Sequence, residues 1–465
     1  MLSHKILRIR LTAVRRTSTM DNTREVAEFL NIKFSGYSGF VWQELEAPQA
    51  HARIGYLQGM CSGQKLHELI LSPFSKMESP DQFTAYLQAL PFLKPYQTLT
   101  QTMESVARGY AVLLYDGRVL LLDLRTELNN SISEANVENV VQGPKNGLSE
   151  DLNTNLFLVR SRYPQPSLQI ESLTAGTVSQ TPIAIVYDAN LADPQVLDAL
   201  RRTLKEIKAP MIQAANQLEL HLNRKNRSLL PTMMVTERPD RIAFNLSQGK
   251  IIVVLHGTPF ALIVPVVFYD FFTSMEDLTQ AYWVGRFLLT VRYIGLAINL
   301  TLASVYVAIA SYNPDFLRVQ LTLSIAGSRA SVPYPSYIEV LFMLVMMELL
   351  TEASIRLPKS IGSTATTVGG LILGQAATQA GLVSNIMIII VAAVAISNFV
   401  VPLAAMGFSL RVLKYILLII TTLSGLTGLI IGTAALLSYL ATLESFGQKY
   451  FRLYMAKPAS SPRSG

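Results

Sequence analysis

Residues 360–410 read SIGSTATTVGGLILGQAATQAGLVSNIMIIIVAAVAISNFVVPLAAMGFSL and contain no Asp, Glu, Lys, Arg or His. A helix needs about 20 apolar residues to cross a bilayer core of about 30 Å. Soluble cores do not require uncharged runs this long, so the stretch indicates a membrane protein. It divides into a segment rich in Gly, Ala and Thr over 362–382 and a strongly apolar segment over 383–406, which we expect to span.

Three neighbouring segments have the same character. Residues 293–314 and 415–443 are long uncharged runs, and the strongly apolar stretch 335–355 contains three glutamates. We therefore predict an α-helical integral membrane domain with four spans, over residues 288–311, 335–356, 383–406 and 414–440.

Two further segments are expected to be associated with the membrane. Residues 251–269 are apolar but contain Pro259, Pro265 and His256, and proline removes a helix hydrogen bond. We expect a strand-like or broken segment at the membrane surface, with a fifth span as the alternative. Residues 362–382 resemble a segment that survives at membrane depth only where other protein covers it.

Small residues in the 362–382 segment recur four positions apart, and this spacing lets helices approach closely. One interpretation is plain packing within the chain, and the other is a re-entrant or interfacial helix that joins subunits. The candidate interface residues are Gly369, Gly370, Gly374, Gln375, Ala377 and Gly381.

The N-terminal half has the composition of a soluble protein. The whole chain is 50% hydrophobic and 15% charged, with a mean hydropathy of +0.33. Charged residues number 51 in residues 1–250 and 20 in residues 251–465. Because charged residues normally make up about a quarter of a soluble chain, the deficit belongs to the second half alone.

Local patterns in the soluble half predict a mixed α/β fold. Asp116-Gly117 lies between two apolar runs over 110–123, which is a strong hairpin signal. We also expect strands over 167–173 and 181–189 and helices over 150–162 and 193–206. The expected organisation is a basic tail (1–20), two α/β subdomains (21–135 and 136–236), a membrane domain (237–448) and a basic C-terminal tail (449–465).

The first 16 residues contain five Lys and Arg but no uninterrupted apolar core, so they do not resemble a signal peptide. They are either a basic arm that touches anionic lipid or a product of start-codon choice. We favour the second interpretation, with Met20 as the true start.

No pattern indicates catalysis. The sequence has no P-loop, no G-x-G-x-x-G after a strand, no H-E-x-x-H and no G-x-S-x-G. The five histidines lack metal-ligand spacing, and the single cysteine, Cys61, excludes an internal disulfide. We expect no catalytic residue, metal or cofactor, and no nucleic-acid binding, because basic residues do not cluster outside the N-terminal tail.

The second predicted span carries the chemically interesting residues. Glu348 and Glu352 are four positions apart and share a helix face, with Thr351 beside them. Carboxylates inside a membrane usually face a cavity or a partner, and in a symmetric oligomer these two would form stacked rings that select cations. In the alternative interpretation both are solvated at the cytoplasmic end and Arg356 pairs with Glu352. Glu339, nearly on the opposite face, is expected near the interface.

Lys and Arg near the span ends favour cytoplasmic N-terminal and C-terminal regions. Arg286 and Arg292 precede the first span, and Arg356 and Lys359 follow the second. Basic residues on the opposite side, such as Arg411, weaken this asymmetry.

Three long motifs resemble the A-subunit family of spore germination receptors, the GerA type. They are VVQGPKNGLSEDLNTNLFLVRSRYPQPSL at 140–168, ERPDRIAFNLSQGKIIVVLHGTPFALIVPVVFYDFF at 237–272, and RLPKSIGSTATTVGGLILGQAA at 356–377. The chain departs from the family pattern at His256, Asn146 and Leu148. The matching motif positions include Glu237, Arg238, Pro239, Asp240, Gly257, Thr258, Pro259, Arg356 and Pro358.

The resemblance implies a location and a role. Family members lie in the inner membrane of bacterial endospores, where they act with a transporter-like B subunit and a lipoprotein C subunit. The A subunit is expected to form a homo-oligomer, a pentamer, that works as a ligand-gated channel for monovalent cations. Two alternatives are a non-conducting scaffold that couples the nutrient-binding partner to a separate channel, and the stage V sporulation paralogue that amplifies germination.

Overall fold

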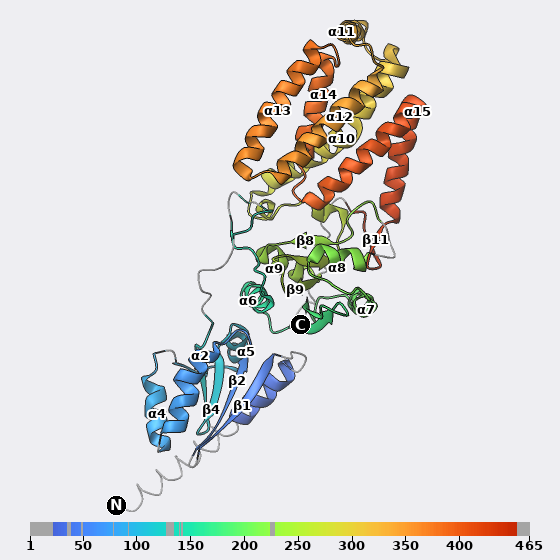
Figure 1. Cartoon of the computed structure of the whole chain (residues 1–465). Helices are drawn as coiled ribbons and strands as arrows, with labels where there is room; N and C mark the ends of the chain where they lie inside the picture. Colours follow the sequence, from blue (N-terminus) through green and yellow to red (C-terminus); the bar gives the residue numbers. More distant parts are fainter. Residues whose placement is uncertain are drawn as a thin grey trace, which may run out of the picture. The chain divides into compact units, whose positions relative to one another are not determined.

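The computed structural model describes residues 22–34, 39–47, 50–77, 79–91, 93–126, 134–138, 140, 143–223 and 228–452, without the side chains of residues 278, 359, 360, 363, 365 and 366. The chain forms two compact units (Figure 1). The α/β unit comprises residues up to 225 together with Val235–Pro265, and the helical unit comprises Asn226–Met234 and the residues from Val266 onward. The predicted basic tail, residues 1–20, lies outside the described residues.

The α/β unit contains two five-stranded sheets. The first has the order β1-β2-β4-β5-β3, with antiparallel neighbours throughout. Its strands are β1 (Phe40–Ala47), β2 (Ala50–Leu57), β3 (Leu93–Pro95), β4 (Ala111–Tyr115) and β5 (Arg118–Leu122). Its helices are one over residues 22–33, α2 (Gly63–Leu66), η1 (His67–Leu71), α3 (Ser72–Lys76), α4 (Pro80–Ala89) and α5 (Leu99–Ala107).

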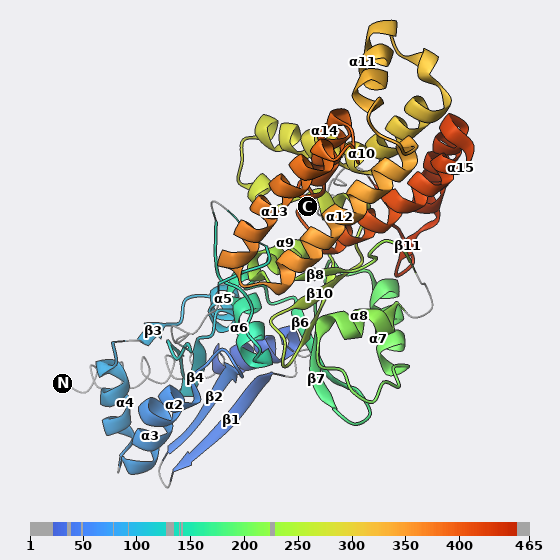
Figure 2. The ribbon, with the colours of Figure 1, turned by 45° about the horizontal axis from the view of Figure 1, so that its top comes forward.

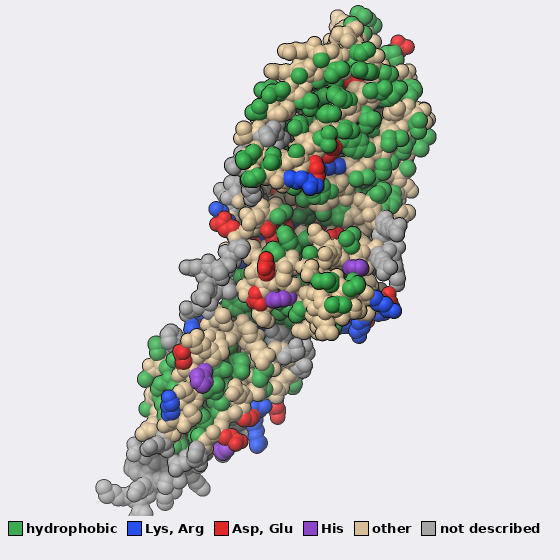
Figure 3. All heavy atoms as spheres, viewed as in Figure 1, with side chains coloured by type: hydrophobic (Ala, Val, Ile, Leu, Met, Phe, Trp, Pro, Cys, Tyr) green, Lys and Arg blue, Asp and Glu red, His purple; other side chains and the backbone are tan. Residues whose placement is uncertain are grey.

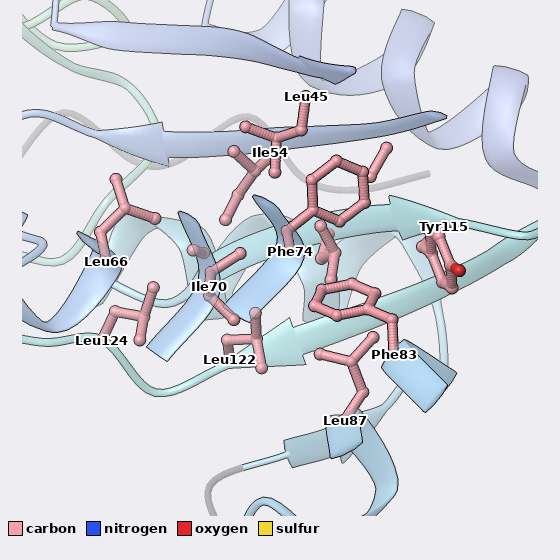
Figure 4. Packing of buried hydrophobic residues seen from close by; sticks show 13 residues of the cluster. Leu45, Ile54, Leu66, Ile70, Phe74, Phe83, Leu87, Tyr115, Leu122 and Leu124 are labelled. Carbon is pink, nitrogen blue, oxygen red and sulfur yellow. The ribbon is translucent and has the colours of Figure 1, made fainter. Parts of the chain in front are cut away.

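The hairpin predicted at Asp116-Gly117 is confirmed. Both residues have positive φ angles, 47° and 69°, as the tight turn between paired strands requires. The turn positions β4 and β5 so that their apolar side chains join the core beneath the sheet. Figure 4 shows this core, in which Phe74 and Phe83 from the helices pack edge to face with 5.0 Å between their ring centroids.

The second sheet has the order β6-β7-β9-β10-β8. Its strands are β6 (Leu168–Ala175), β7 (Thr181–Asp188), β8 (Met234–Thr236), β9 (Ile251–Leu255) and β10 (Ala261–Val264). Its helices are α6 (Leu152–Arg162), α7 (Pro194–Lys205), α8 (Ala215–Leu222) and α9 (Pro239–Ser247). The predicted helices 150–162 and 193–206 and strands 167–173 and 181–189 are confirmed, and Asp151 and Asp193 cap the two helices as N-cap residues do.

The segment 251–269 does not form a fifth span, and the strand-like structure predicted for it is confirmed over Ile251–Leu255 and Ala261–Val264. Residues 251–264 form the neighbouring strands β9 and β10, every residue of which is buried, and they belong to the α/β unit. The apolar pattern suggested membrane association, but a strand covered on both faces is also apolar at every position. The boundary between the units accordingly falls at Pro265 rather than at residue 237.

The helical unit contains six α-helices in its described part (Figure 2). They are α10 (Tyr282–Tyr312), α11 (Val319–Arg329), α12 (Ser336–Arg356), α13 (Lys359–Gln379), α14 (Asn385–Asn398) and α15 (Ala404–Thr442). Short 3-10 turns lie at η2 (Phe268–Phe272), η3 (Met275–Leu278) and η4 (Pro314–Phe316).

Two of these helices, α10 and α15, are long and apolar enough to cross a membrane by length and composition. The predicted span 288–311 lies within α10. The predicted span 414–440 lies within α15 but crosses Gly425, whose φ of 60° and ψ of −142° interrupt the helix, so this stretch consists of two helices joined at a bend. The span predicted over 335–356 coincides with α12, whose acidic residues lower its hydropathy. The span predicted over 383–406 contains α14, which has 14 residues and ends before a turn that leads into α15. The segment 362–382 lies largely in α13, a continuous helix of 21 residues.

The chain after α15 returns to the start of the helical unit. The hairpin of β11 (Glu444–Ser445) and β12 (Gln448–Lys449) precedes Tyr450, which is buried. The amide of Phe268 donates to the carbonyl of Tyr450 at 2.8 Å. Residues 449–452 are therefore packed structure rather than the tail that we expected, and residues 453–465 lie outside the described part.

Candidate functional site

The helical unit displays apolar side chains on its exterior and buries a small number of charged groups. Figure 3 shows hydrophobic side chains over most of its visible face, with charged side chains gathered toward one end of that face. Trp283 and Leu423 are 80% and 77% exposed. Asn299, Glu339 and Lys414, by contrast, are buried. These buried polar groups are the candidates for function, because such groups are costly in an apolar surrounding unless they are paired.

Glu348 of α12 joins two cationic side chains of α15. Its Oε1 accepts a hydrogen bond from Lys414 Nζ at 2.9 Å, and its Oε2 lies 3.4 Å from Arg411 Nη1. The Lys414 side chain is 8% exposed and that of Glu348 is 28% exposed. The carboxylate therefore holds α12 against the first three turns of α15. The sequence expectation placed Glu348 in a pore without identifying these cationic partners, because nothing in a linear pattern brings residues 348 and 414 together.

Glu352 has a different environment although it lies one turn further along α12. Its carboxylate accepts from Arg356 at 2.7 Å in an i,i+4 pair, and both side chains are more than half exposed. This is the pairing that the alternative interpretation of the sequence anticipated. The hydroxyl of Thr351 donates to backbone carbonyls of its own helix, those of Met347 and Glu348.

Glu339 is the residue whose importance the sequence did not reveal. Its side chain is fully buried, and its Oε1 accepts hydrogen bonds from both the backbone N–H and the hydroxyl of Ser384, each at 2.6 Å. Ser384 is also the N-cap residue of α14. The negative charge thus lies at the positive end of a helix, where the macrodipole stabilises it. Arg329 at the end of α11 lies 3.4 Å away. The sequence does contain a signal for the start of α14, because Ser384-Asn385 follows Gly381 and serine is a common N-cap residue. It does not indicate that Glu339 is the partner.

The candidate interface residues of α13 divide between two environments. A Cβ on Gly369 would lie 3.3 Å from Leu350 of α12, and Ala377 is buried in the unit. A Cβ on Gly370, however, would meet nothing within 4 Å, and Gln375 is exposed. Gly374 meets only the tip of Ile388. Gly369 and Ala377 therefore pack within the chain, whereas the positions of Gly370 and Gln375 are uncovered in the single chain.

Gly381 ends α13 with a φ of +65°, and a Cβ there would lie 3.0 Å from the carbonyl oxygen of Ser331. The left-handed conformation favours glycine. Pro358 lies between α12 and α13, and its carbonyl accepts from the amides of Ile361 and Gly362. Gly381 and Pro358 therefore shape the turns at the two ends of α13.

The Glu237-Arg238-Pro239-Asp240 motif fastens a loop to the start of α9. Arg238 is 1% exposed. Its guanidinium donates to Asp240 at 2.6 Å and to the carbonyls of Glu138 and Pro144, each at 3.1 Å. The Glu237 carboxylate accepts from the amides of Val137 and Glu138. Pro239 occupies the first helical turn, where its lack of an N–H costs nothing. The motif thus ties Val137, Glu138 and Pro144 to the start of α9.

The Gly257-Thr258-Pro259 motif lies in the turn between β9 and β10. Gly257 has a φ of +83° and donates its amide to the carbonyl of Glu150 at 2.7 Å, and Thr258 is buried. The neighbouring Asp151 caps α6, and hydrogen bonds from the hydroxyl and amide of Thr154 lower the pKa of its carboxyl. In the part of the chain that the structure describes, no group of three or more His, Cys, Asp or Glu is placed to hold a metal ion.

Sequence comparisons give the context for these sites. Residues 28–461 match the family described as Bacillus/Clostridium GerA spore germination protein. The chain belongs to the GerA family. Spore germination protein KA of Bacillus subtilis (strain 168) is 33% identical over 87% of this chain and 76% of its own length. GerLA of Bacillus cereus, also named a spore germination protein, is 35% identical over 76% of this chain and 72% of its own.

Two further similar proteins are a relative named as a membrane protein and a solved N-terminal domain. The relative YfkQ of Bacillus subtilis, named an uncharacterized membrane protein, is 31% identical over 92% of this chain and 85% of its own length. Together with the apolar helices α10 and α15, this supports membrane association of the GerA-family chain. The crystal structure of the N-terminal domain of the A subunit of the Bacillus megaterium spore germinant receptor GerK3 aligns at 24% identity, over 52% of this chain and 94% of its own. The TM-score of this alignment is 0.40.

Proposed function

We propose that this chain is the A subunit of a nutrient germinant receptor of bacterial endospores, and that it oligomerises into a ligand-gated channel that releases monovalent cations. Membership of the GerA family carries the germination role. The open space at Gly370 and Gly374 of α13 supports assembly, because small residues four apart allow close helix contact. The expected assembly is a pentamer that works with a transporter-like B subunit and a lipoprotein C subunit.

The proposed ion path runs along α12, with Glu352 and Thr351 at its cytoplasmic mouth. Glu352 is exposed, and its only ion pair among the described residues is with a neighbour on its own helix. Because both partners of this pair are more than half exposed, the pair is weak, and the carboxylate can exchange Arg356 for a cation once copies surround a central axis. Glu348 is held by two cations of α15 and contributes less to selectivity. We place the protein in the inner spore membrane, with its N-terminal domain and C-terminus in the cytoplasm.

Conductance of the purified full-length protein in planar bilayers tests this proposal. Wild-type protein should conduct K⁺ and Na⁺ in preference to Cl⁻, and Glu352→Gln should lower that preference by several-fold, because it removes one charge per subunit from the mouth. Asp315→Asn, at an exposed position beyond α10, is the matched control and should leave selectivity unchanged. Selectivity that is equal in wild type and Glu352→Gln would rule out the assigned mouth.

A non-conducting scaffold is the second candidate, and the neutralised environment of Glu348 favours it. A carboxylate already paired with Lys414 and Arg411 gives little attraction to a passing cation. Native mass spectrometry of the purified complex separates the two candidates. A ring of several copies supports the channel, whereas one copy per complex supports the scaffold.

A further inference from the structure

The cluster of Glu348, Arg411 and Lys414 carries one positive charge that the described residues do not balance. Glu348 supplies one negative charge against two positive charges, and no other carboxylate among the residues that the structure describes lies within ion-pair distance of either cation. The nearby Glu352 is paired with Arg356, so this second pair is neutral overall. An unbalanced charge that is largely buried is costly unless a counter-ion accompanies it.

The place of the cluster along the helices indicates where that counter-ion comes from. α15 is interrupted at Gly425, whose φ of 60° and ψ of −142° are not helical. Its first part, from residue 404 to residue 424, is therefore about 31 Å long at 1.5 Å per residue, close to a hydrocarbon core of about 30 Å. The start of this part accordingly lies near one edge of the core. Arg411 and Lys414 lie in its first three turns, and long cationic side chains reach toward the headgroups from such positions. Basic pockets between membrane helices bind lipid headgroups for this reason.

A small crevice opens beside the two cations. It is lined by the charged trio and by apolar residues of α12 and α14, including Leu344, Met347, Val391 and Val394, with Phe399. Its volume of about 20 Å³ holds one group the size of a water molecule. The crevice therefore admits a single oxygen atom, and the remainder of a headgroup must lie outside it.

The surface around the crevice is apolar and uncovered in the single chain. Phe399 after α14 is 71% exposed, and Phe408 of α15 is 52% exposed. Arg411 lies over the ring of Phe408, 5.2 Å from its centroid. Exposed apolar side chains next to a partly buried positive charge match a molecule with an anionic head and an aliphatic body.

We propose that Arg411 and Lys414 bind the phosphate of an anionic phospholipid, with one phosphate oxygen in the crevice and an acyl chain along Phe399 and Phe408. The lipid supplies the negative charge that the cluster lacks. Binding holds the start of α15 against α12 through Glu348, so lipid composition stabilises this helix pair. The proposal rests on the helical unit lying in a bilayer.

Lipid binding to the purified full-length protein in non-ionic detergent tests the proposal by native mass spectrometry. Phosphatidylglycerol should bind more tightly than phosphatidylcholine, whose headgroup carries no net charge. Lys414→Met should weaken phosphatidylglycerol binding by about five- to tenfold, since one basic residue contributes about 1 kcal/mol near anionic lipid. Glu348→Gln should strengthen it by a similar factor, because this variant raises the net charge of the cluster.

The control is Arg318→Gln. This variant removes an exposed charge between α10 and α11 and should leave lipid binding unchanged. The proposal is overturned if Lys414→Met and Arg411→Gln bind phosphatidylglycerol as wild type does, or if Glu348→Gln weakens binding. Inorganic phosphate that raises the melting temperature of lipid-free protein as much as phosphatidylglycerol does would assign the site to a free anion instead. Failure of wild type to float with phosphatidylcholine vesicles would contradict the bilayer location itself, and hence the proposed function.

Discussion

In the α/β unit the strands β9 and β10 are buried along their whole length, whereas in the helical unit large apolar side chains such as Leu423 and Ile389 point outward. Both sets of elements are rich in apolar side chains, but the strands bury these side chains and the helices expose many of them. The difference indicates that the α/β unit faces water and the helical unit faces lipid. Water drives apolar strands into a core, but a helix in lipid gains nothing by hiding leucine, so packing and polar contacts hold helices together instead.

The largest expected effect compares two positions that are both more than half exposed. Ile294, in the middle part of α10, and Ile32, in the first helix of the α/β unit, are 55% and 72% exposed. Ile294→Lys should destabilise the membrane-inserted protein by about 3 kcal/mol, the cost of a lysine at mid-membrane, whereas Ile32→Lys should be within about 0.5 kcal/mol of wild type. Membrane insertion and thermal unfolding in nanodiscs measure both. Equal effects would mean that the two exteriors face the same solvent.

The next effect concerns a buried charge in the α/β unit. Arg238→Met should destabilise that unit by about 3 kcal/mol, because it leaves Asp240 without its partner and removes two bonds to backbone carbonyls. Hydrogen exchange in the full-length protein should accelerate in residues 134–148 and 237–247. Arg202→Met, at a position on α7 outside this network, is the matched control. Unchanged protection in the variant would show that the motif does not hold the loop.

A corresponding change in the helical unit should cost less. Glu339→Gln keeps an oxygen that accepts from Ser384 but removes the charge at the start of α14, so we expect a loss of about 1–2 kcal/mol. The measurement is the melting temperature in nanodiscs. Glu352→Gln, on the same helix but exposed, should change it little. A larger loss from the exposed residue would reverse the assignment of Glu339 as the structural carboxylate of α12.

The smallest effect is a pH dependence confined to the α/β unit. Hydrogen bonds from Thr154 lower the pKa of Asp151 in the folded state below its ordinary value of 3.8. The cap therefore contributes fully above the unfolded pKa, and this contribution is lost as the pH falls through the folded pKa. Asp151→Ala should cost about 1 kcal/mol at pH 7. Hydrogen exchange in α6 should show this difference shrinking toward pH 3, and a constant difference would exclude a charged cap.

Much of the α/β unit could be predicted from local patterns. The turn at Asp116-Gly117 and the caps Asp151 and Asp193 are decided by neighbouring residues, so their signals lie within a few positions of sequence. The apolar run 251–264 suggested a membrane-associated segment, because burial in a sheet and burial in lipid both favour an apolar composition. Only the partners of β9, which are β7 and β10, distinguish the two.

The sequence by itself determined that the second half of the chain is apolar beyond the needs of a soluble core, that its α/β half contains a hairpin and capped helices, and that three motifs place it with the GerA family. Local spacing carries each of these properties. The tertiary structure alone decided which partners each glutamate of α12 contacts. Glu348 and Glu352 share a face by spacing, yet Lys414 and Arg411 approach only the first, and Ser384 approaches Glu339. The reason is physical: the state of a buried charge depends on partners that lie tens of residues away in sequence.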